Sequence, residues 1–457
     1  MKNKIISFIL TLAILTGIFG TLSLSASAAN DSVSVYIDGE LIPFDVEPEI
    51  INGRTMVPMR KIFEYLGADV TWYSSSRKIW ATCGYLRIIL QVDNKNMFIN
   101  DNSIELDSPP VIKDGRTLVP LRAVAEAFSA KVKWESSERK VNIETPYPKS
   151  DYMYDEKFDK YHITTSYGDF EYFDLLIEDD VLTVTGYSQD KSIEEVAIKF
   201  NNGLLDNITS VKPNKEFELS VDLTEQIPSD EAVLSVYTKK ENDDFFWSYI
   251  YGTVFIEKNK NKYSFKKPLV WENNKDYMTK WENPIAYINP DIDAEIVALS
   301  NKICKKADND YEKILLIHDW VADNIYYDFD YYYNRDSADI SLDALSVYQS
   351  KRSVCEGYAN LTQALINAQG IPCRKVSGYS LGLSSNLRYW TEETANKEIS
   401  NHAWNQAYVD NRWINIDATW DSGNKYENGE FLYEGIENHL YFDISDVFFS
   451  YNHKYIR

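Results

Sequence analysis

Three residues in the C-terminal third of the chain carry the side chains that acyl transfer requires. Cys355 lies in the run SVCEGYANL, His402 opens NHAWNQAYV, and Asp417 lies in RWINIDATW. A thiolate attacks a carbonyl carbon, an imidazole moves the proton, and a carboxylate fixes the tautomer of that imidazole. The ordered cysteine, histidine and aspartate therefore predict a nucleophilic site that works through a thioester.

The sequence around Cys355 is typical of a helix start. Ser353 is a candidate cap, and Tyr358, Leu361 and Leu365 recur at helical spacing behind it. Cys355 is then expected in the first turn, where free backbone N–H groups and the helix dipole favour an anion. This environment lowers a thiol pKa and increases the thiolate fraction.

His402 and Asp417 belong to two successive strand-like runs with a turn near residues 410–411. Adjacent antiparallel strands lie roughly 5 Å apart, so the two side chains can hydrogen-bond if they share a face. The alternative for Cys355 is a disulfide with Cys373, which an oxidising compartment would permit. That pairing would leave the histidine and the aspartate without a role.

Oxyanion stabilisation needs donors near the nucleophile. The backbone N–H of Cys355 is one candidate, and the side chain of Gln349, six residues upstream, is a second. His318 is expected to be structural, on the surface beside the apolar face of its helix. His439 and His453 lack metal-ligand spacing. We therefore expect no metal and no cofactor.

Four segments follow one another along the 457 residues. Residues 1–28 have a positive start, an apolar core and the small-residue end SASAA, which predicts a cleaved signal peptide. Residues 31–146 contain an internal repeat, because NGRTMVPMRKIFEYLGADVTW aligns without gaps on DGRTLVPLRAVAEAFSAKVKW. Each copy predicts a strand, a turn, a helix after the proline, and a strand that ends near tryptophan.

The remaining segments are expected to be all-β and then mixed. Residues 150–270 contain short β-type runs separated by turns about every ten residues, which favours a sandwich. Residues 285–457 begin with helical periodicity and end with three strand candidates, which predicts an antiparallel meander. The overall expectation is a multidomain α+β protein.

Net charge and location restrict the partners. A formal charge of −23 argues against nucleic-acid backbones and anionic membranes. The predicted signal peptide favours a secreted or wall-associated protein without stable membrane insertion after cleavage. The four cysteines are too few for a disulfide scaffold.

Two segments resemble known families. The G-R-T-L-V-P-x-R pattern of residues 31–146 resembles the copper amine oxidase N-terminal-like domain, which implies an extracellular accessory module that could hold a wall or surface polymer. Copper chemistry is not expected there, because this segment contains no histidine. The runs HDWVADNIYYD, SVCEGYANL, IPCRKVSGY, NHAWNQAYV and RWINIDATWD resemble the transglutaminase-like superfamily, in family order.

The second resemblance implies a papain-like fold with Cys355 as nucleophile, His402 as general base and acid, and Asp417 as the orienting residue. The leading hypothesis is a secreted thiol enzyme that hydrolyses amide bonds in proteins or cell-wall peptides. One alternative is a crosslinking transglutaminase, in which an amine resolves the thioester. The other is a non-catalytic surface-binding protein.

Overall fold

The computed structural model describes residues 32–456, except 101, 147–159, 165–169, 189–191, 202–206, 213–214, 228, 279–281, 335–339, 383–389 and 437–438. The predicted signal peptide at 1–28 lies outside the described residues. Among the helices that are described, none is both long and apolar enough to span a bilayer.

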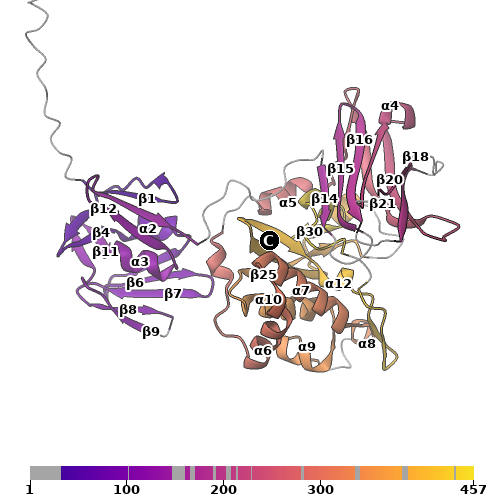
Figure 1. The fold of residues 1–457 in the computed structure, drawn as a ribbon. Helices are drawn as coiled ribbons and strands as arrows, with labels where there is room; N and C mark the ends of the chain where they lie inside the picture. Colours follow the sequence, from indigo (N-terminus) through magenta and orange to yellow (C-terminus); the bar gives the residue numbers. More distant parts are fainter. Residues whose placement is uncertain are drawn as a thin grey trace, which may run out of the picture. The chain divides into compact units, whose positions relative to one another are not determined.

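The two repeat copies fold alike (Figure 1). The first contains β4 (Arg54–Pro58), α2 (Met59–Tyr65) and β5 (Asp69–Tyr73), and the second contains β11 (Arg116–Pro120), α3 (Leu121–Ala127) and β12 (Lys131–Glu135). Strands β4 and β11 pair with each other in antiparallel orientation. Apolar residues in and just after these helices are buried in both copies: Ile62, Leu66, Val124 and Phe128.

Short strands complete the sheets of this segment. One sheet has the order β12-β13-β1-β2, the second β10-β11-β4-β3 and the third β5-β6-β7-β8-β9. The strands not yet given are β1 (Ser34–Ile37), β2 (Glu40–Leu41), β3 (Glu49–Ile51), β6 (Lys78–Cys83), β7 (Leu86–Gln91), β8 (Asn96–Ile99), β9 (Asn102–Glu105), β10 (Val111–Lys113) and β13 (Lys140–Glu144).

The middle segment consists of two antiparallel sheets that share one apolar core, as a sandwich requires. Leu175 and Val184 from one sheet and Val196 and Leu234 from the other belong to that core. The first sheet contains β14 (Lys160–Thr164), β15 (Phe170–Glu178), β16 (Val181–Ser188) and β19 (Glu216–Asp222). The second contains β18 (Asn207–Ser210), β17 (Ile193–Phe200), β20 (Glu231–Lys240), β21 (Trp247–Asn259) and β22 (Lys262–Phe265), and α4 (Leu223–Gln226) follows β19.

The C-terminal segment begins with helices, as predicted. In chain order they are α5 (Trp271–Met278), η1 (Pro284–Tyr287), α6 (Ala294–Ile303), η2 (Cys304–Lys306), α7 (Asp310–Asn324), α8 (Phe329–Tyr333), α9 (Ala344–Ser350) and α10 (Cys355–Asn367). Three short helices follow later: α11 (Glu392–Ala395), α12 (Ala418–Asp421) and α13 (Asp446–Phe449). One face of α7 is fully buried at Ile314, Ile317 and Val321, and so is its C-cap residue, Ile325.

The predicted meander is present and has one more strand than expected. Strands β25 (Cys373–Ser380), β26 (His402–Val409) and β27 (Arg412–Ile416) are antiparallel neighbours, and α10 packs against β25 and β26 (Figure 1). Asp410 and Asn411 both have positive φ, which suits the two-residue turn between β26 and β27. The additional strand β30 (His453–Tyr455) pairs with β25.

A small mixed sheet lies at the start of α10. It contains β24 (Arg352–Ser353), β23 (Tyr326–Asp328), β28 (Lys425–Glu427) and β29 (Glu430–Leu432). Strand β23 pairs in parallel with β24 and with β28, which brings distant segments together. This pairing holds the residues just before Cys355 against the end of α7.

Candidate active site

Cys355 is the first residue of α10 and is 9% exposed. The prediction that Ser353 caps this helix is wrong. The N-cap residue is Val354, which makes no side-chain cap, and Ser353 lies in β24 with its hydroxyl buried and without a partner among the described residues. The backbone N–H groups of the first turn are therefore not used by a capping side chain.

His402 and Asp417 are in direct contact. Nε2 of His402 lies 2.6 Å from Oδ2 of Asp417. Asn405 pairs with Ile416, so the same register places Asp417 opposite Trp404. His402 lies two residues from Trp404 and therefore on the same face, which makes the histidine and the aspartate diagonal neighbours. The hairpin register thus produces the contact that the two strand patterns predicted.

Asp417 is fixed from two sides because it also caps α12. Its Oδ1 accepts hydrogen bonds from the backbone N–H groups of Thr419 and Trp420 at 3.1 and 3.3 Å. Its Oδ2 is left to face His402. A carboxylate held in this way orients the imidazole and stabilises its charged form.

The three side chains form an electrostatically coupled set. Burial raises the pKa of Cys355, but the charge of His402, a hydrogen bond to its ring and the backbone N–H of Ala403 bring the pKa below its usual value. Burial lowers the pKa of His402, yet Asp417 and Cys355 raise it to about 10. Burial also raises the pKa of Asp417, and the charge of His402 holds it well below the usual range. A thiolate beside an imidazolium is the favoured state at neutral pH.

The ring nitrogens of His402 have separate partners. Nε2 bonds to Asp417, so Nδ1 is the nitrogen that remains for the thiol, with which His402 shares a hydrogen bond. Nδ1 can then take the proton from the thiol and deliver it to a leaving group. The arrangement can carry out acyl transfer.

Two of the tryptophans in this region border the histidine. The ring centroid of Trp404 lies 6.0 Å and that of Trp420 5.5 Å from the ring of His402. Both tryptophans are buried. Trp413 instead packs against Tyr408 and Tyr287. Trp404 and Trp420 therefore shield the imidazole from water, whereas Trp413 is part of the packing elsewhere.

The position of Gln349 does not support its predicted role as an oxyanion donor. It lies near the end of α9 and is exposed, and in the described part of the chain it has no hydrogen bond to Cys355 or His402. Helix α9 ends at Ser350, and its C-cap residue Lys351 has a left-handed backbone conformation. Strand β24 follows and separates Gln349 from the start of α10 along the chain. The geometry favours the backbone donors of the first turn instead.

The disulfide alternative is not realised. All four cysteines are free, and Cys373 is fully buried in β25. Burial raises the pKa of the Cys373 thiol far above its usual value, and a hydrogen bond from Asn405 offsets this only in part. Cys373 is therefore an inert core thiol, in contrast to Cys355.

His453 completes the surroundings of Asp417 and was not identified from the sequence. Its Nε2 lies 3.1 Å from Oδ2 of Asp417, and its ring stacks on Phe449 at a centroid distance of 4.0 Å. Burial lowers the pKa of His453 to about 4, although Asp417 opposes the shift. The ring is thus neutral at pH 7 and donates one hydrogen bond to the carboxylate. The only sequence signal was the presence of a histidine near the C-terminus.

Asn452 links His453 to Tyr441. Oδ1 of Asn452 lies 2.7 Å from Nδ1 of His453, and Nδ2 of Asn452 donates to the hydroxyl of Tyr441 at 2.7 Å. The amide therefore helps to hold the ring of His453 with Nε2 directed at Asp417.

Two domain families match this chain. Residues 297–418 match the transglutaminase-like superfamily, and residues 36–143 match the copper amine oxidase N-terminal domain. Kyphoscoliosis peptidase of Mus musculus and that of Homo sapiens are each 30% identical over 125 residues, or 27% of this chain and 18% of the relative. The chain thus spans about a fifth of the length of these curated relatives.

Solved structures show lower sequence identity to this chain. The periplasmic domain of TgpA from Pseudomonas aeruginosa is 9% identical, with a TM-score of 0.23 over 57% of this chain and 75% of that chain. The family matches instead agree with the motifs and with the positions of the three side chains. This chain therefore contains a transglutaminase-like core domain at residues 297–418 and a copper amine oxidase N-terminal domain at residues 36–143.

Proposed function

We propose that this protein is a secreted hydrolase that cleaves amide bonds of proteins or cell-wall peptides through a thioester on Cys355. The observation that carries the proposal is the contact of His402 with Asp417 at 2.6 Å beside a thiol at the start of α10. These three groups supply a nucleophile, a proton carrier and an orienting carboxylate.

The proposed reaction has two halves. In the first, the thiolate of Cys355 attacks the amide carbonyl carbon, the C–N bond breaks, and His402 gives its proton to the departing amine. In the second, water attacks the thioester carbonyl while His402 removes a proton from it. The C–S bond then breaks, the carboxylic acid leaves, and the original ion pair is restored. The first-turn N–H groups of α10 are the proposed oxyanion donors.

The partner of the enzyme is proposed to be a protein or peptide substrate, without nucleic acid. The net charge of −23 supports this choice, since it disfavours polyanions and attracts basic peptides. The N-terminal module is proposed to hold a wall or surface polymer, and the predicted signal peptide supports export. Fractionation of cells expressing the whole chain, with sequencing of the N-terminus, tests the location.

A peptide-release assay tests the reaction. Whole chain is incubated with a peptide library in water enriched in ¹⁸O, with and without a primary amine, and the products are identified by mass. Hydrolysis incorporates one ¹⁸O into the new carboxylate. We expect Cys355→Ser to abolish release and Asp417→Asn to reduce it by roughly 10³- to 10⁴-fold, because a neutral amide no longer stabilises the imidazolium or holds its tautomer as the carboxylate does.

The matched control is Cys304→Ala, which removes another thiol of the same segment and is expected to keep full activity. Amine-linked products that exceed hydrolysis would favour the crosslinking alternative. Absence of both product types, together with a Cys355 no more reactive than an ordinary thiol, would favour the non-catalytic surface protein.

A further inference from the structure

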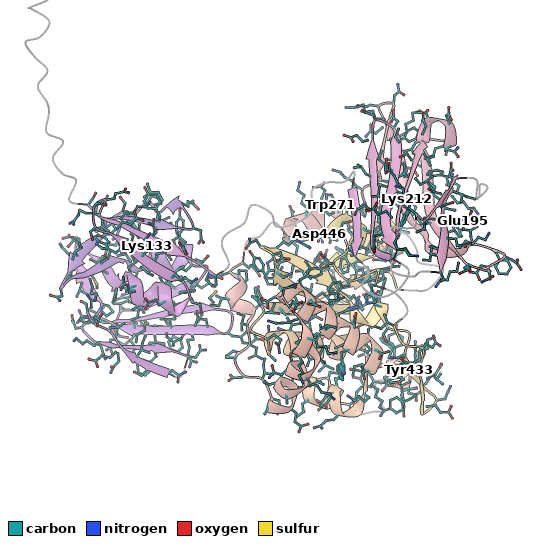
Figure 2. All side chains as sticks on the ribbon, in the orientation of Figure 1. Lys133, Glu195, Lys212, Trp271, Tyr433 and Asp446 are labelled. Atoms are coloured by element: carbon teal, nitrogen blue, oxygen red, sulfur yellow. The ribbon has the colours of Figure 1, made fainter. Side chains whose placement is uncertain are left out.

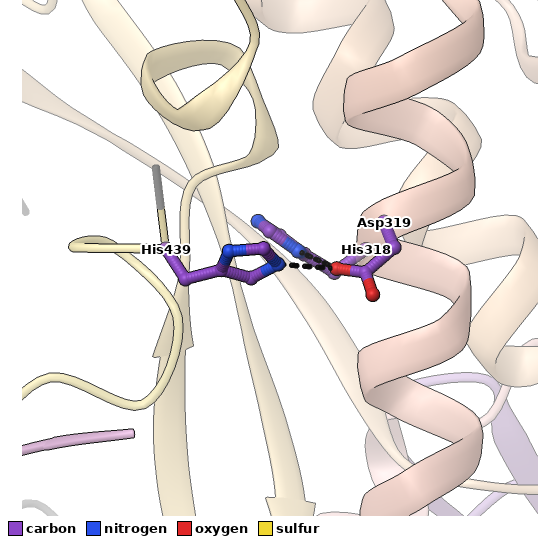
Figure 3. Close-up of side chains that lie close together, drawn as sticks. All are labelled: His318, Asp319 and His439. Carbon is purple, nitrogen blue, oxygen red and sulfur yellow. Dashed lines mark hydrogen bonds and ion pairs between the residues drawn. The ribbon is translucent and has the colours of Figure 1, made fainter. Parts of the chain in front are cut away.

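A second histidine–aspartate cluster lies outside the catalytic residues. His318 and Asp319 are consecutive in α7, and His439 reaches them from the segment before α13 (Figure 3). Nδ1 of His318 lies 3.0 Å and Nε2 of His439 2.8 Å from the same atom, Oδ1 of Asp319. All three side chains are buried, which contradicts the expected surface position of His318.

We propose that His318, Asp319 and His439 bind a divalent transition-metal ion of the zinc class. Their donor atoms all lie within 4.8 Å of one another. Imidazole nitrogens and a carboxylate oxygen are preferred zinc ligands, and bonds of about 2.0–2.2 Å in a tetrahedron place the ligand atoms roughly 3.3 Å apart. The separations of 2.8 and 3.0 Å to Oδ1 therefore need to open by less than about 1 Å to admit the ion.

The outer nitrogen of His318 has the partner that a metal ligand usually has. Nε2 of His318 lies 3.1 Å from Oδ2 of Asp421, so the ring is held with Nδ1 directed toward Asp319. A carboxylate behind a ligating histidine fixes its tautomer and increases its basicity. Asp421 is itself fully buried and accepts from the backbone N–H of Tyr441, which keeps it in place.

An oxygen of Asp319 supplies an independent indication of a ligand. Asp319 is only 6% exposed, and its Oδ2 is buried without a hydrogen-bond partner among the described residues. A buried carboxylate oxygen without a donor is costly. A metal ion held by this carboxylate would remove that cost.

A cavity borders the cluster at Asp319. This residue lines a space of about 640 Å³ together with Trp320, Asp323, Tyr433 and Glu434, whereas His318 and His439 are not among the lining residues. Tyr433, which Figure 2 labels, is 64% exposed, so the cavity opens to solvent at this residue. The carboxylates of Asp319, Asp323 and Glu434 favour entry of a cation. Three protein ligands leave the fourth position of a tetrahedral ion for water, as in zinc sites that are not closed.

The second grouping of this kind, His402, Asp417 and His453, does not suit an ion as well. Both histidines bond through Nε2 to Oδ2 of Asp417, and the remaining nitrogen of His402 serves the thiol. A metal there would displace the proton on which the proposed acyl transfer depends. The cluster of His318, Asp319 and His439 has no role in the proposed acyl transfer that a metal ion would disturb.

Zinc binding to the whole chain tests the proposal. The protein is stripped with a chelator, dialysed, and titrated with Zn²⁺ alone by calorimetry, and the zinc-loaded wild type is examined by X-ray absorption. We expect one ion per chain, coordinated by two imidazoles and oxygen without sulfur. His439→Gln and Asp319→Asn should each weaken binding by more than 100-fold, and Asp421→Asn by 10- to 100-fold.

Two variants serve as matched controls for the metal measurement. Cys355→Ser removes the competing thiol, and His453→Gln alters the other grouping, so both should keep the zinc affinity of the wild type. The proposal is overturned if folded wild type binds no zinc at micromolar concentration. It is also overturned if sulfur ligates the ion or if Cys355→Ser abolishes binding. The absorption spectrum of the wild type decides these outcomes even where a variant fails to fold.

Discussion

His402 and His453 bond to the same carboxylate oxygen, Oδ2 of Asp417, at 2.6 and 3.1 Å. The environments of the two rings differ, since the pKa of His402 is raised to about 10 while burial lowers that of His453 to about 4. One ring is therefore charged at neutral pH and the other is a neutral donor. His453 is a positioning residue for the carboxylate that orients His402.

Replacement of His453 tests this positioning role. His453→Phe removes a hydrogen bond to a charged group, which corresponds to about 1.5–3 kcal/mol. We expect kcat/KM for a cleaved peptide to fall about 10- to 100-fold. His453→Gln restores an N–H donor near Oδ2 and should recover activity to within about threefold of wild type. Equal activity in the phenylalanine and glutamine variants, with similar melting temperatures, would contradict the role.

The reactivity of Cys355 should show the ion pair directly. The pKa of Cys355 is lowered and that of His402 is raised to about 10, so the thiolate persists below pH 7 and the imidazolium up to about pH 10. Alkylation by iodoacetamide, mapped by mass, should stay fast as pH falls below 7 and decline only near the lowered thiol pKa. In His402→Ala the alkylation rate should instead rise only as pH exceeds the pKa of an ordinary thiol, about 8.5, because burial of Cys355 then raises its pKa without the opposing charge of His402. Identical profiles for the two proteins would remove the basis of the proposed mechanism.

A glycine in α10 should control where Cys355 lies. A Cβ atom on Gly357 would come within 1.9 Å of Oγ of Ser353 and 2.8 Å of Val347. Gly357→Ala should lower the free energy of unfolding by about 1–3 kcal/mol through overpacking, and it should slow alkylation of Cys355. Urea denaturation provides the measurement.

Ser353→Ala is the matched control for this change. The hydroxyl of Ser353 has no partner among the described residues, so its removal alone should change the free energy of unfolding by less than about 0.5 kcal/mol. Combined with Gly357→Ala it should recover part of the loss, because the nearest clashing atom is gone. Strict additivity of the two changes would show that the clash is not the cause.

Acid should destabilise the fold through His453. Its pKa is about 4 when folded and about 6.5 when unfolded, so the unfolded chain binds more protons between these values. The free energy of unfolding should therefore fall by about 2–3 kcal/mol as pH decreases from 6.5 to 4. Asp421 acts in the opposite direction, because burial raises its pKa to about 6 and the folded state takes up that proton.

Comparison of wild type with His453→Gln isolates the contribution of this histidine, since Asp421 is common to both proteins. Urea denaturation at several pH values should show a shallower decline for the variant between pH 6.5 and 4. Parallel curves would mean that His453 does not titrate in this window.

The sequence alone predicted the main elements and the three candidate residues. Local patterns specified the helix start at Cys355, the hairpin that carries His402 and Asp417, and the repeat at the N-terminus. These signals are short-range, because amphipathic spacing and turn residues act within about 20 neighbours. The catalytic roles of the three residues stay predictions, as do export and the substrate.

Only the tertiary structure decided which distant side chains meet. Strand β30 has three residues and no periodicity to reveal it, yet its pairing with β25 brings His453 to Asp417. His318 and His439 are 121 positions apart, so their spacing could not indicate a shared carboxylate. The same long-range packing left Gln349 exposed and Ser353 without a capping role. Burial against non-local neighbours sets these contacts, and local sequence does not encode it.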